Sequence, residues 1–177
     1  MEKAIIYKRV VTYLKKKIVG KKKINILEIG CGSKIYKDYL FEHNYEGLDL
    51  PHDEKITRAK WTNKSNLPEI EIKLENFKPK KNYDLIFSVG TIFMLDDKDL
   101  ENFIKIISEL KKNGGEVIIF DYKTKTINGL IKNQNDGFVY RQNNYLELIK
   151  NKFEENFLQI DIEWCSNNFL KNINKET

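Results

Sequence analysis

Two spacings of apolar side chains occur along the chain, and they predict two kinds of element. In residues 3–19 and 97–111 apolar residues recur every three or four positions with charged residues between them, which is typical of helices that bury one face. Other apolar runs are short and either continuous or alternating, which is typical of strands. Strands are expected at residues 24–29, 45–49, 70–74, 83–89, 116–122 and 158–164, and shorter helices at 34–43 and 144–153.

The alternation of strands and helices predicts right-handed crossovers and an α/β fold, with a mostly parallel sheet covered by helices on both faces. At 177 residues, 41% hydrophobic and 32% charged, the chain fits one domain with one core. We expect a basic amphipathic helix and lead-in at residues 1–23, the domain itself at 24–166, and a polar tail at 167–177. The polar residues 123–138 are expected to form a loop.

The net charge of +5 is concentrated near the N-terminus. Residues 1–23 contain nine Lys and Arg residues and one acid, Glu2, so this segment carries +8 and the remainder carries −3. Three roles fit such a helix: packing on the sheet with its lysines in water, contact with RNA phosphates, or contact with an anionic membrane surface.

Composition also sets an expectation for the compartment. No run approaches the roughly 20 apolar residues of a membrane span, and the N-terminus lacks the apolar segment of a secretory signal. The two cysteines, Cys31 and Cys165, are too few for a disulfide framework and fit a reducing compartment. We therefore expect no stable membrane insertion and a cytoplasmic protein.

The first expected strand ends in a glycine turn, and the second ends in an acid. Gly30, Cys31 and Gly32 form the turn, and Asp49 lies seventeen positions past Gly32. In open α/β sheets such a turn lets the backbone approach a nucleoside, and the acid accepts hydrogen bonds from ribose hydroxyls. A dinucleotide site has a third glycine where this chain has Ile35, and no phosphate-binding lysine follows as in a P-loop. The pattern therefore favours a nucleoside cofactor without a pyrophosphate.

Four segments together resemble the class I S-adenosylmethionine-dependent methyltransferases, and most closely their type 11 branch. They are ILEIGCGS, YEGLDL, NYDLIFSVGTIFML and LKKNGGEVIIFDY, in the order and at nearly the spacing of that family, from about residue 24 to 122. The resemblance implies a Rossmann-like three-layer sandwich with a seven-stranded sheet, or one truncated at the last strand. It also implies S-adenosyl-L-methionine as cofactor and an enzyme that transfers its methyl group.

The resemblance assigns the residues around the first strand to the amino acid end of the cofactor. Glu28 would orient the turn and that end of the cofactor. Gly30, Cys31 and Gly32 would pass under the methionine portion. The family often has a third glycine where this chain has Lys34.

The nucleoside and the methyl group are assigned to the next strands. The resemblance implies that Asp49 binds the ribose and that Leu50 covers the adenine. It places Ser88, Val89 and Gly90 under the sulfonium and the methyl group, because they end the fourth strand at the switch point of the sheet.

The acid that bonds the adenine amino group in this family ends the third strand, and two alignments are open for it. One gives Glu75 and Asn76, directly after residues 70–74, and the other gives residues 61–63. Residues 70–74 alternate apolar and charged side chains as an edge strand does, so Glu75 and Asn76 are preferred.

Methyl transfer from a sulfonium is an in-line displacement in which the protein mainly aligns the reactants, so no catalytic residue is assigned. The acceptor is expected to be an O or N atom. The short segment 123–142, where this family inserts its substrate lid, favours a small molecule. Residues expected on the acceptor side are Thr91, Phe93, Asp121, Tyr122, Tyr140 and Arg141. Asp121 would either accept a proton or cap a loop.

Other chemistries are disfavoured by specific residues. The segment SVGT after the fourth strand differs from the Asp/Asn-Pro-Pro-Tyr of DNA amino-methyltransferases. Neither cysteine lies where a pyrimidine C5 methyltransferase places its nucleophile. His43 and His52 lack clustered ligands, so no metal site is expected. RNA methylation aided by the basic helix, and a catalytically silent partner that keeps the fold, remain alternatives.

Overall fold

A computed structural model of the chain describes residues 2–51, 67–92, 95–122, 130–132, 139–141 and 161–165. Side chains are described within 7–51, 67–92 and 95–120. The expected helix at 144–153, the tail at 167–177, Phe93 and the alternative adenine segment 61–63 lie outside the described residues.

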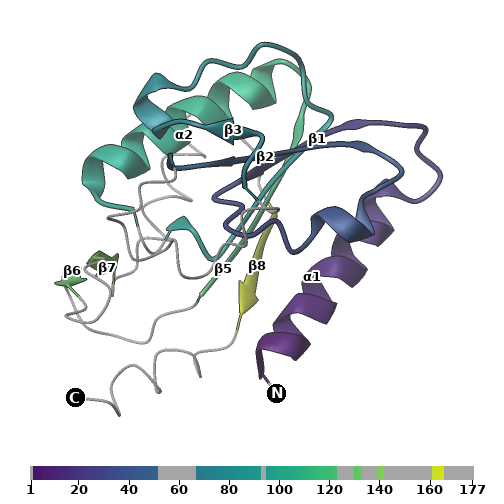
Figure 1. Ribbon diagram of the computed structural model, residues 1–177, viewed down its shortest axis with the longest axis horizontal. Coiled ribbons are helices and arrows are strands. Elements are labelled where there is room, and N and C mark those ends of the chain that lie inside the picture. The colour runs from purple at the N-terminus through teal and green to yellow at the C-terminus, as the bar shows by residue number, and fades with distance from the viewer. Residues whose placement is uncertain are drawn as a thin grey trace.

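A six-stranded parallel sheet forms the centre of the molecule, in the order β3-β2-β1-β4-β5-β8 (Figure 1). Its strands are β1 (Asn25–Ile29), β2 (Asn44–Asp49), β3 (Ile70–Glu71), β4 (Leu85–Val89), β5 (Glu116–Tyr122) and β8 (Asp161–Cys165). The order reverses between β1 and β4, which pair in parallel with Ile29 opposite Ser88. The expected parallel α/β fold is confirmed, and a ligand of such a sheet binds where the order reverses.

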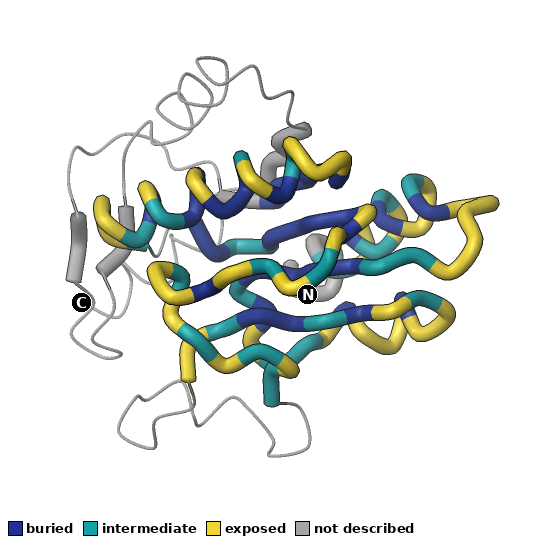
Figure 2. Tube along the Cα trace, turned by 90° about the horizontal axis from the view of Figure 1, so that it is seen from above, coloured by how far each residue is buried: buried dark blue, intermediate teal, exposed yellow. Residues whose placement is uncertain are grey.

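In the part of the chain that the structure describes, one helix covers each face of the sheet, which gives three layers (Figure 1). Alternate residues of each strand point to opposite faces. Leu27, Ile86 and Ile119 therefore belong to the core beneath α2 (Asp97–Lys112). Ile26, Leu85, Phe87, Ile118 and Phe120 belong to the core beneath α1 (Glu2–Ile18). Figure 2 shows the buried strands between the two helices, whose outer surfaces are exposed.

The N-terminal helix packs on the sheet. Val10, Leu14 and Ile18 are buried in the core, whereas Lys8 and Lys16 face solvent. Of the three roles expected for this helix, packing with its lysines in water is the one the structure confirms. Its apolar face is consequently not available to lie on a membrane surface. No described helix is both long and apolar enough to cross a membrane.

The second long helix matches its expected bounds within one residue. Asp96 caps it by accepting a hydrogen bond from Asp99 N at 2.8 Å. Its apolar stripe is buried, and Asn113 and Gly114 follow its last residue, as expected of a helix end.

Three expected elements differ in the structure. The expected helix at 34–43 is a single 3-10 turn, η1 (Lys37–Tyr39), and the positive φ of Lys34 excludes a right-handed helix that begins at that residue. Residues 70–74 pair with β2 only at Ile70–Glu71, because the chain then turns into η4 (Leu74–Asn76). The expected loop at 123–138 contains β6 (Leu130–Lys132), which pairs antiparallel with β7 (Val139–Arg141).

Candidate functional site

The glycine turn follows β1 directly and is tied to β2 by backbone hydrogen bonds. Gly30 N and Cys31 N both donate to Leu48 O, at 2.8 and 3.2 Å. Gly30 and Gly32 have φ values of 74° and 51°, in the left-handed region that favours glycine. The turn therefore lies at the carboxyl edge of β1 and β2, beside the point where the strand order reverses.

The surroundings of the two glycines differ. A Cβ at Gly30 would overlap the Thr91 side chain, whereas a Cβ at Gly32 would have no heavy atom within 4 Å. The backbone at Gly32 is thus exposed to open space and accessible to a ligand.

Asp49 ends β2 and fixes the turn through its carboxylate. Oδ2 accepts a hydrogen bond from Gly32 N at 2.6 Å, and Oδ1 accepts one from Leu50 N at 2.7 Å. Leu50 is exposed beside it.

Glu28 is buried in the α1 side of the sheet. Its Oε2 accepts a hydrogen bond from the hydroxyl of Tyr45, a contact that sequence analysis did not predict. Burial raises the pKa of the Glu28 carboxyl to about 8, although the bond from Tyr45 opposes that rise. The negative charges of Asp49 and Glu69 add to the rise. Glu28 therefore keeps its proton well above the pH at which a free carboxyl loses it.

A second acid, Glu69, was not predicted at all. Its Oε1 lies 2.8 Å from Lys34 Nζ and 2.7 Å from Lys37 Nζ, and its Oε2 accepts from Gly47 N at 2.8 Å. Burial on its own would raise the pKa of Glu69, but these hydrogen bonds outweigh it and lower the pKa to about 2. No local pattern singles out Glu69, because its partners lie 22 to 35 residues away.

The end of β4 supplies the residues expected near the methyl group. Ser88 is buried, and its Oγ has no hydrogen-bond partner in the described part of the chain. Val89 is partly buried, and Gly90 N donates to Phe120 O at 2.8 Å. Thr91 Oγ1 lies 3.3–3.5 Å from the carbonyl oxygens of Ile29, Gly30 and Val89. Thr91, expected on the acceptor side, thus lies under the glycine turn.

Glu75 and Asn76 lie in η4, just beyond the carboxyl end of β3. Both are exposed, and Glu75 Oε2 lies 2.6 Å from Lys98 Nζ in the first turn of α2. The hydrogen bond and charge of Lys98 lower the pKa of Glu75. Glu75, the acid expected after the third strand, therefore forms an ion pair with a residue of α2.

The remaining acceptor-side candidates are placed by their backbone only. Asp121 and Tyr122 end β5, where they pair with Trp164 and Cys165 of β8. Arg141 ends β7, opposite Leu130. The carboxyl end of β5 belongs to the same edge of the sheet as the glycine turn, since the strands are parallel.

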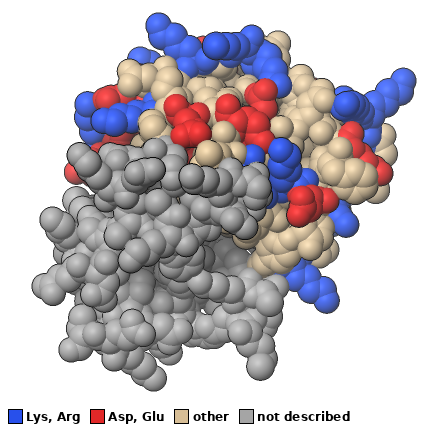
Figure 3. Space-filling view, viewed as in Figure 1, with Lys and Arg blue, Asp and Glu red and all other residues tan. Residues whose placement is uncertain are grey.

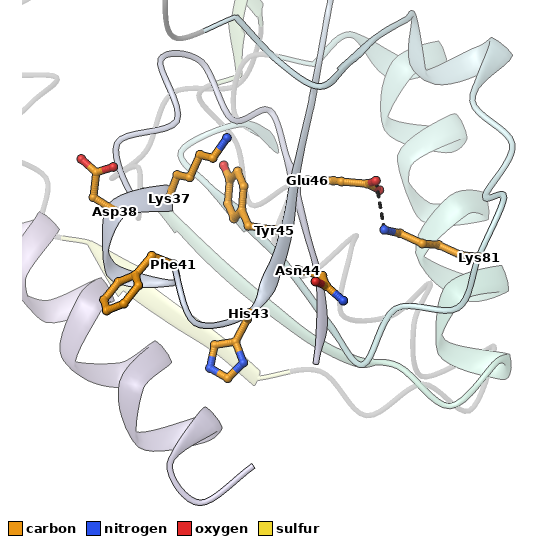
Figure 4. Close-up of a pocket in the computed structure, with 8 residues that line it drawn as sticks. All are labelled: Lys37, Asp38, Phe41, His43, Asn44, Tyr45, Glu46 and Lys81. Carbon is orange, nitrogen blue, oxygen red and sulfur yellow. Dashed lines mark ion pairs between the residues drawn. The ribbon is translucent and has the colours of Figure 1, made fainter. Parts of the chain in front are cut away.

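A surface hollow of about 470 Å³ lies at the other end of β2, where the strand begins (Figure 4). Its side chains are mixed in character, and Glu46 and Lys81 in its wall form an ion pair of 2.9 Å. The residues that line it are Lys37, Asp38, Phe41, His43, Asn44, Tyr45, Glu46 and Lys81. None of these residues belongs to the glycine turn. The candidate site is therefore identified by the residues of the turn and of the strand ends, and not by the volume of this hollow.

On the face seen in Figure 3, acidic and basic side chains are interspersed on the described surface. Among the described residues, no group of three or more His, Cys, Asp or Glu side chains could hold a metal ion.

Comparison with known proteins gives relatives for part of the chain. No family model matches. Malonyl-[acyl-carrier protein] O-methyltransferase 2 of Ilyobacter polytropus is 37% identical over 91 residues, 46% of this chain and 35% of that protein. Malonyl-[acyl-carrier protein] O-methyltransferase 1 of the same organism is 33% identical over 112 residues, 60% of this chain and 41% of that protein. The chain thus spans less than half the length of these curated relatives.

Among solved structures, the fold is similar to that of 1,6-didemethyltoxoflavin-N1-methyltransferase from Burkholderia thailandensis. The TM-score is 0.60 at 13% identity, over 85% of this chain and 66% of that one. The sheet order and this similarity show that the chain has the Rossmann-like fold of that methyltransferase. Both curated relatives named above are malonyl-[acyl-carrier protein] O-methyltransferases.

Proposed function

We propose that this chain binds S-adenosylmethionine and transfers its methyl group to an O or N atom of a small-molecule acceptor. One observation carries the proposal. The Asp49 carboxylate at the end of β2 is held by Gly32 N and Leu50 N, beside a turn whose Gly32 faces open space. An acid next to an accessible backbone is what a ribose and its substituent require.

The residues present fit this cofactor. Asp49 would accept hydrogen bonds from the two ribose hydroxyls, and the exposed Leu50 would cover one side of the adenine. Gly30, Cys31 and Gly32 would pass beneath the methionine portion. For the adenine amino group we propose Asn76 in preference to Glu75, since Glu75 is paired with Lys98.

The bound cofactor would supply an activated methyl group, so the chain needs mainly to align an acceptor with it. Ser88 and Val89 would lie at the end of β4 nearest that group, and Tyr122 and Arg141 on the acceptor side. Asp121, at the end of β5, would take up a proton if the acceptor must lose one. Both relatives are named for malonyl-[acyl-carrier protein], so a malonyl group, free or carried on that protein, is the first acceptor group to test.

Two further proposals concern an RNA acceptor and the cellular location of the protein. The exposed lysines of α1, such as Lys8 and Lys16, support including RNA in the acceptor screen. The use of only two cysteines, of which Cys31 is buried and free, supports a cytoplasmic location.

The test is a calorimetric titration of the protein with S-adenosylhomocysteine, with NAD as a comparison ligand. We expect binding of S-adenosylhomocysteine alone. In the variant Asp49→Ala the affinity should fall at least tenfold, because charge-assisted hydrogen bonds contribute about 1.5–3 kcal/mol each.

The matched control is Asp38→Ala, which removes an exposed acid from η1. It should bind as the wild type does. Unchanged affinity in a folded Asp49→Ala variant would exclude the ribose role of Asp49. Failure of the wild type to bind S-adenosylhomocysteine would favour a catalytically silent protein.

A further inference from the structure

Lys34 has a backbone conformation that L-residues with a side chain rarely adopt. Its φ is 52°, and among the described residues it is the one non-glycine with a positive φ. It also occupies the position at which the resemblance places a third glycine. Such a conformation persists only where surrounding contacts hold it, since it costs free energy for a residue with a Cβ.

The Lys34 side chain crosses β2 and is held at its far end. A Cβ added at Gly47 would come within 3.2 Å of Lys34 Cδ and 2.6 Å of Cys31 Sγ, so both side chains lie directly over this glycine. Lys34 Nζ lies 2.8 Å from Glu69 Oε1, and the Lys34 side chain is only 8% exposed. Glu69 Oε2 accepts from Gly47 N at 2.8 Å. One carboxylate thus fixes both the lysine and the strand beneath it.

The backbone of Lys34 links the glycine turn to the next turn of the chain. Lys34 N donates to Cys31 O at 2.9 Å, and Lys34 O accepts from Lys37 N at 3.1 Å. Lys37 Nζ in turn lies 2.7 Å from Glu69 Oε1. A change of φ at Lys34 would therefore move the Gly30–Lys34 segment on one side and η1 on the other.

We propose that the ion pair between Lys34 and Glu69 is a positioning device that takes the place of a third glycine in the cofactor turn. It holds Lys34 in the left-handed conformation and thereby keeps Gly32 N on the carboxylate of Asp49. Glu69 acts through the turn and is a positioning residue, not a ligand contact. This inference rests on the proposed function, which makes S-adenosylmethionine the ligand of the turn.

The first experiment measures the affinity for S-adenosylhomocysteine in two single variants and their combination. Lys34→Met keeps the stem of the side chain but removes its charge, and Glu69→Gln keeps the shape of the acid. Each should weaken binding about tenfold, because the strained conformation loses its support. The double variant should be about as weak as Glu69→Gln alone, because both substitutions remove the ion pair between Lys34 and Glu69.

Lys34→Gly gives the decisive comparison. Glycine adopts the left-handed conformation without support, so Lys34→Gly and Lys34→Gly combined with Glu69→Gln should bind within about twofold of the wild type. If the ion pair serves only general stability, Lys34→Gly should behave as Lys34→Met does. That result would overturn the proposal.

The control variant is Lys17→Met, which removes a charge from the 2.8 Å ion pair with Glu116 at the start of β5. It should leave the affinity unchanged, and a loss equal to that of Lys34→Met would count against the proposal. Hydrogen exchange of the Gly32 amide, measured without ligand, provides a second readout. It should accelerate about tenfold in Glu69→Gln and return to the wild-type rate once Lys34→Gly is added.

The two readouts separate the two proposals. If the wild type fails to bind S-adenosylhomocysteine, the proposed function fails, and the exchange of the Gly32 amide alone decides the role of the ion pair. If the wild type binds but neither affinity nor exchange changes in Glu69→Gln, the positioning role fails and the proposed function stands.

Discussion

Gly30 and Gly32 lie two positions apart in one turn, yet their surroundings differ. At Gly30 a Cβ would overlap the buried Thr91 side chain, which lies under the turn. At Gly32 there is open space, and the backbone N–H is bonded to Asp49. We therefore expect the first glycine to be needed for packing within the protein, and propose that the second is needed for the approach of a ligand.

Substitution of each glycine should separate stability from affinity. Gly30→Ala should lower the free energy of unfolding by about 3 kcal/mol, from backbone strain and overpacking against Thr91. Gly32→Ala should cost only about 1 kcal/mol of strain, but it should weaken S-adenosylhomocysteine binding at least tenfold because its methyl group occupies the ligand's space. Urea unfolding and calorimetry measure the two effects. Equal destabilisation by both substitutions would contradict this assignment.

Glu28 makes the stability of the fold depend on pH. Its folded-state pKa of about 8 lies above the value of 4.5 for a free carboxyl. The folded protein therefore binds the proton more tightly than the unfolded chain does. The stabilisation is complete below about pH 4.5 and is lost as the pH rises to about 8. The slope attributable to Glu28 is at most about 1.4 kcal/mol per pH unit.

Glu28→Gln tests this dependence. The amide is neutral at every pH and can still accept the hydrogen bond from the Tyr45 hydroxyl. Urea unfolding between pH 5 and 8 should show a stability that falls with pH in the wild type, and a smaller fall in the variant. Parallel pH profiles for the two proteins would exclude Glu28 as the titrating group.

At the scale of elements, the two long helices bury apolar stripes on opposite faces of one sheet. The stripe of α1 contacts strands that lie far from it in the sequence, such as β4 and β5, and its lysines remain outside. Its amphipathic pattern alone fits packing, RNA binding and membrane binding equally well. The buried positions of Val10, Leu14 and Ile18 show which partner the apolar face has.

Leu14→Ala tests whether this packing stabilises the whole domain. Leu14 is fully buried, so the substitution should lower the free energy of unfolding by about 2–5 kcal/mol through lost burial and an incompletely filled cavity. The exposed neighbour Lys16 serves as control, and Lys16→Ala should change stability by no more than about 0.5 kcal/mol. Thermal or urea unfolding measures both. An unaffected Leu14→Ala variant would mean that α1 docks without contributing to stability.

At the scale of the whole molecule, the parallel sheet gathers the candidate site at one edge. The turn after β1, the acid that ends β2 and the polar residues after β4 come from separate parts of the sequence, but parallel strands bring their carboxyl ends together. The hollow at the start of β2 lies outside this arrangement (Figure 4). The position of the proposed site thus follows from topology.

The sequence by itself determined those strands and helices that are specified by residues close together in the chain. Buried apolar runs located β1, β4 and β5, and the helical stripe and its capping acid located α2. The glycine turn and Asp49 were identifiable for the same reason, because backbone conformation and strand ends are encoded within a few residues. The parallel α/β fold followed from the order of these elements.

Only the tertiary structure decided which side chains meet across long stretches of chain. Tyr45 donates to Glu28, Glu69 holds Lys34, and Glu75 pairs with Lys98, and none of these contacts leaves a periodic signal. The 34–43 segment is likewise not a helix, since Lys34 has a positive φ and its side chain is held by the distant Glu69. Such pairings depend on the register of strands that are distant in sequence, so they form only when the sheet assembles.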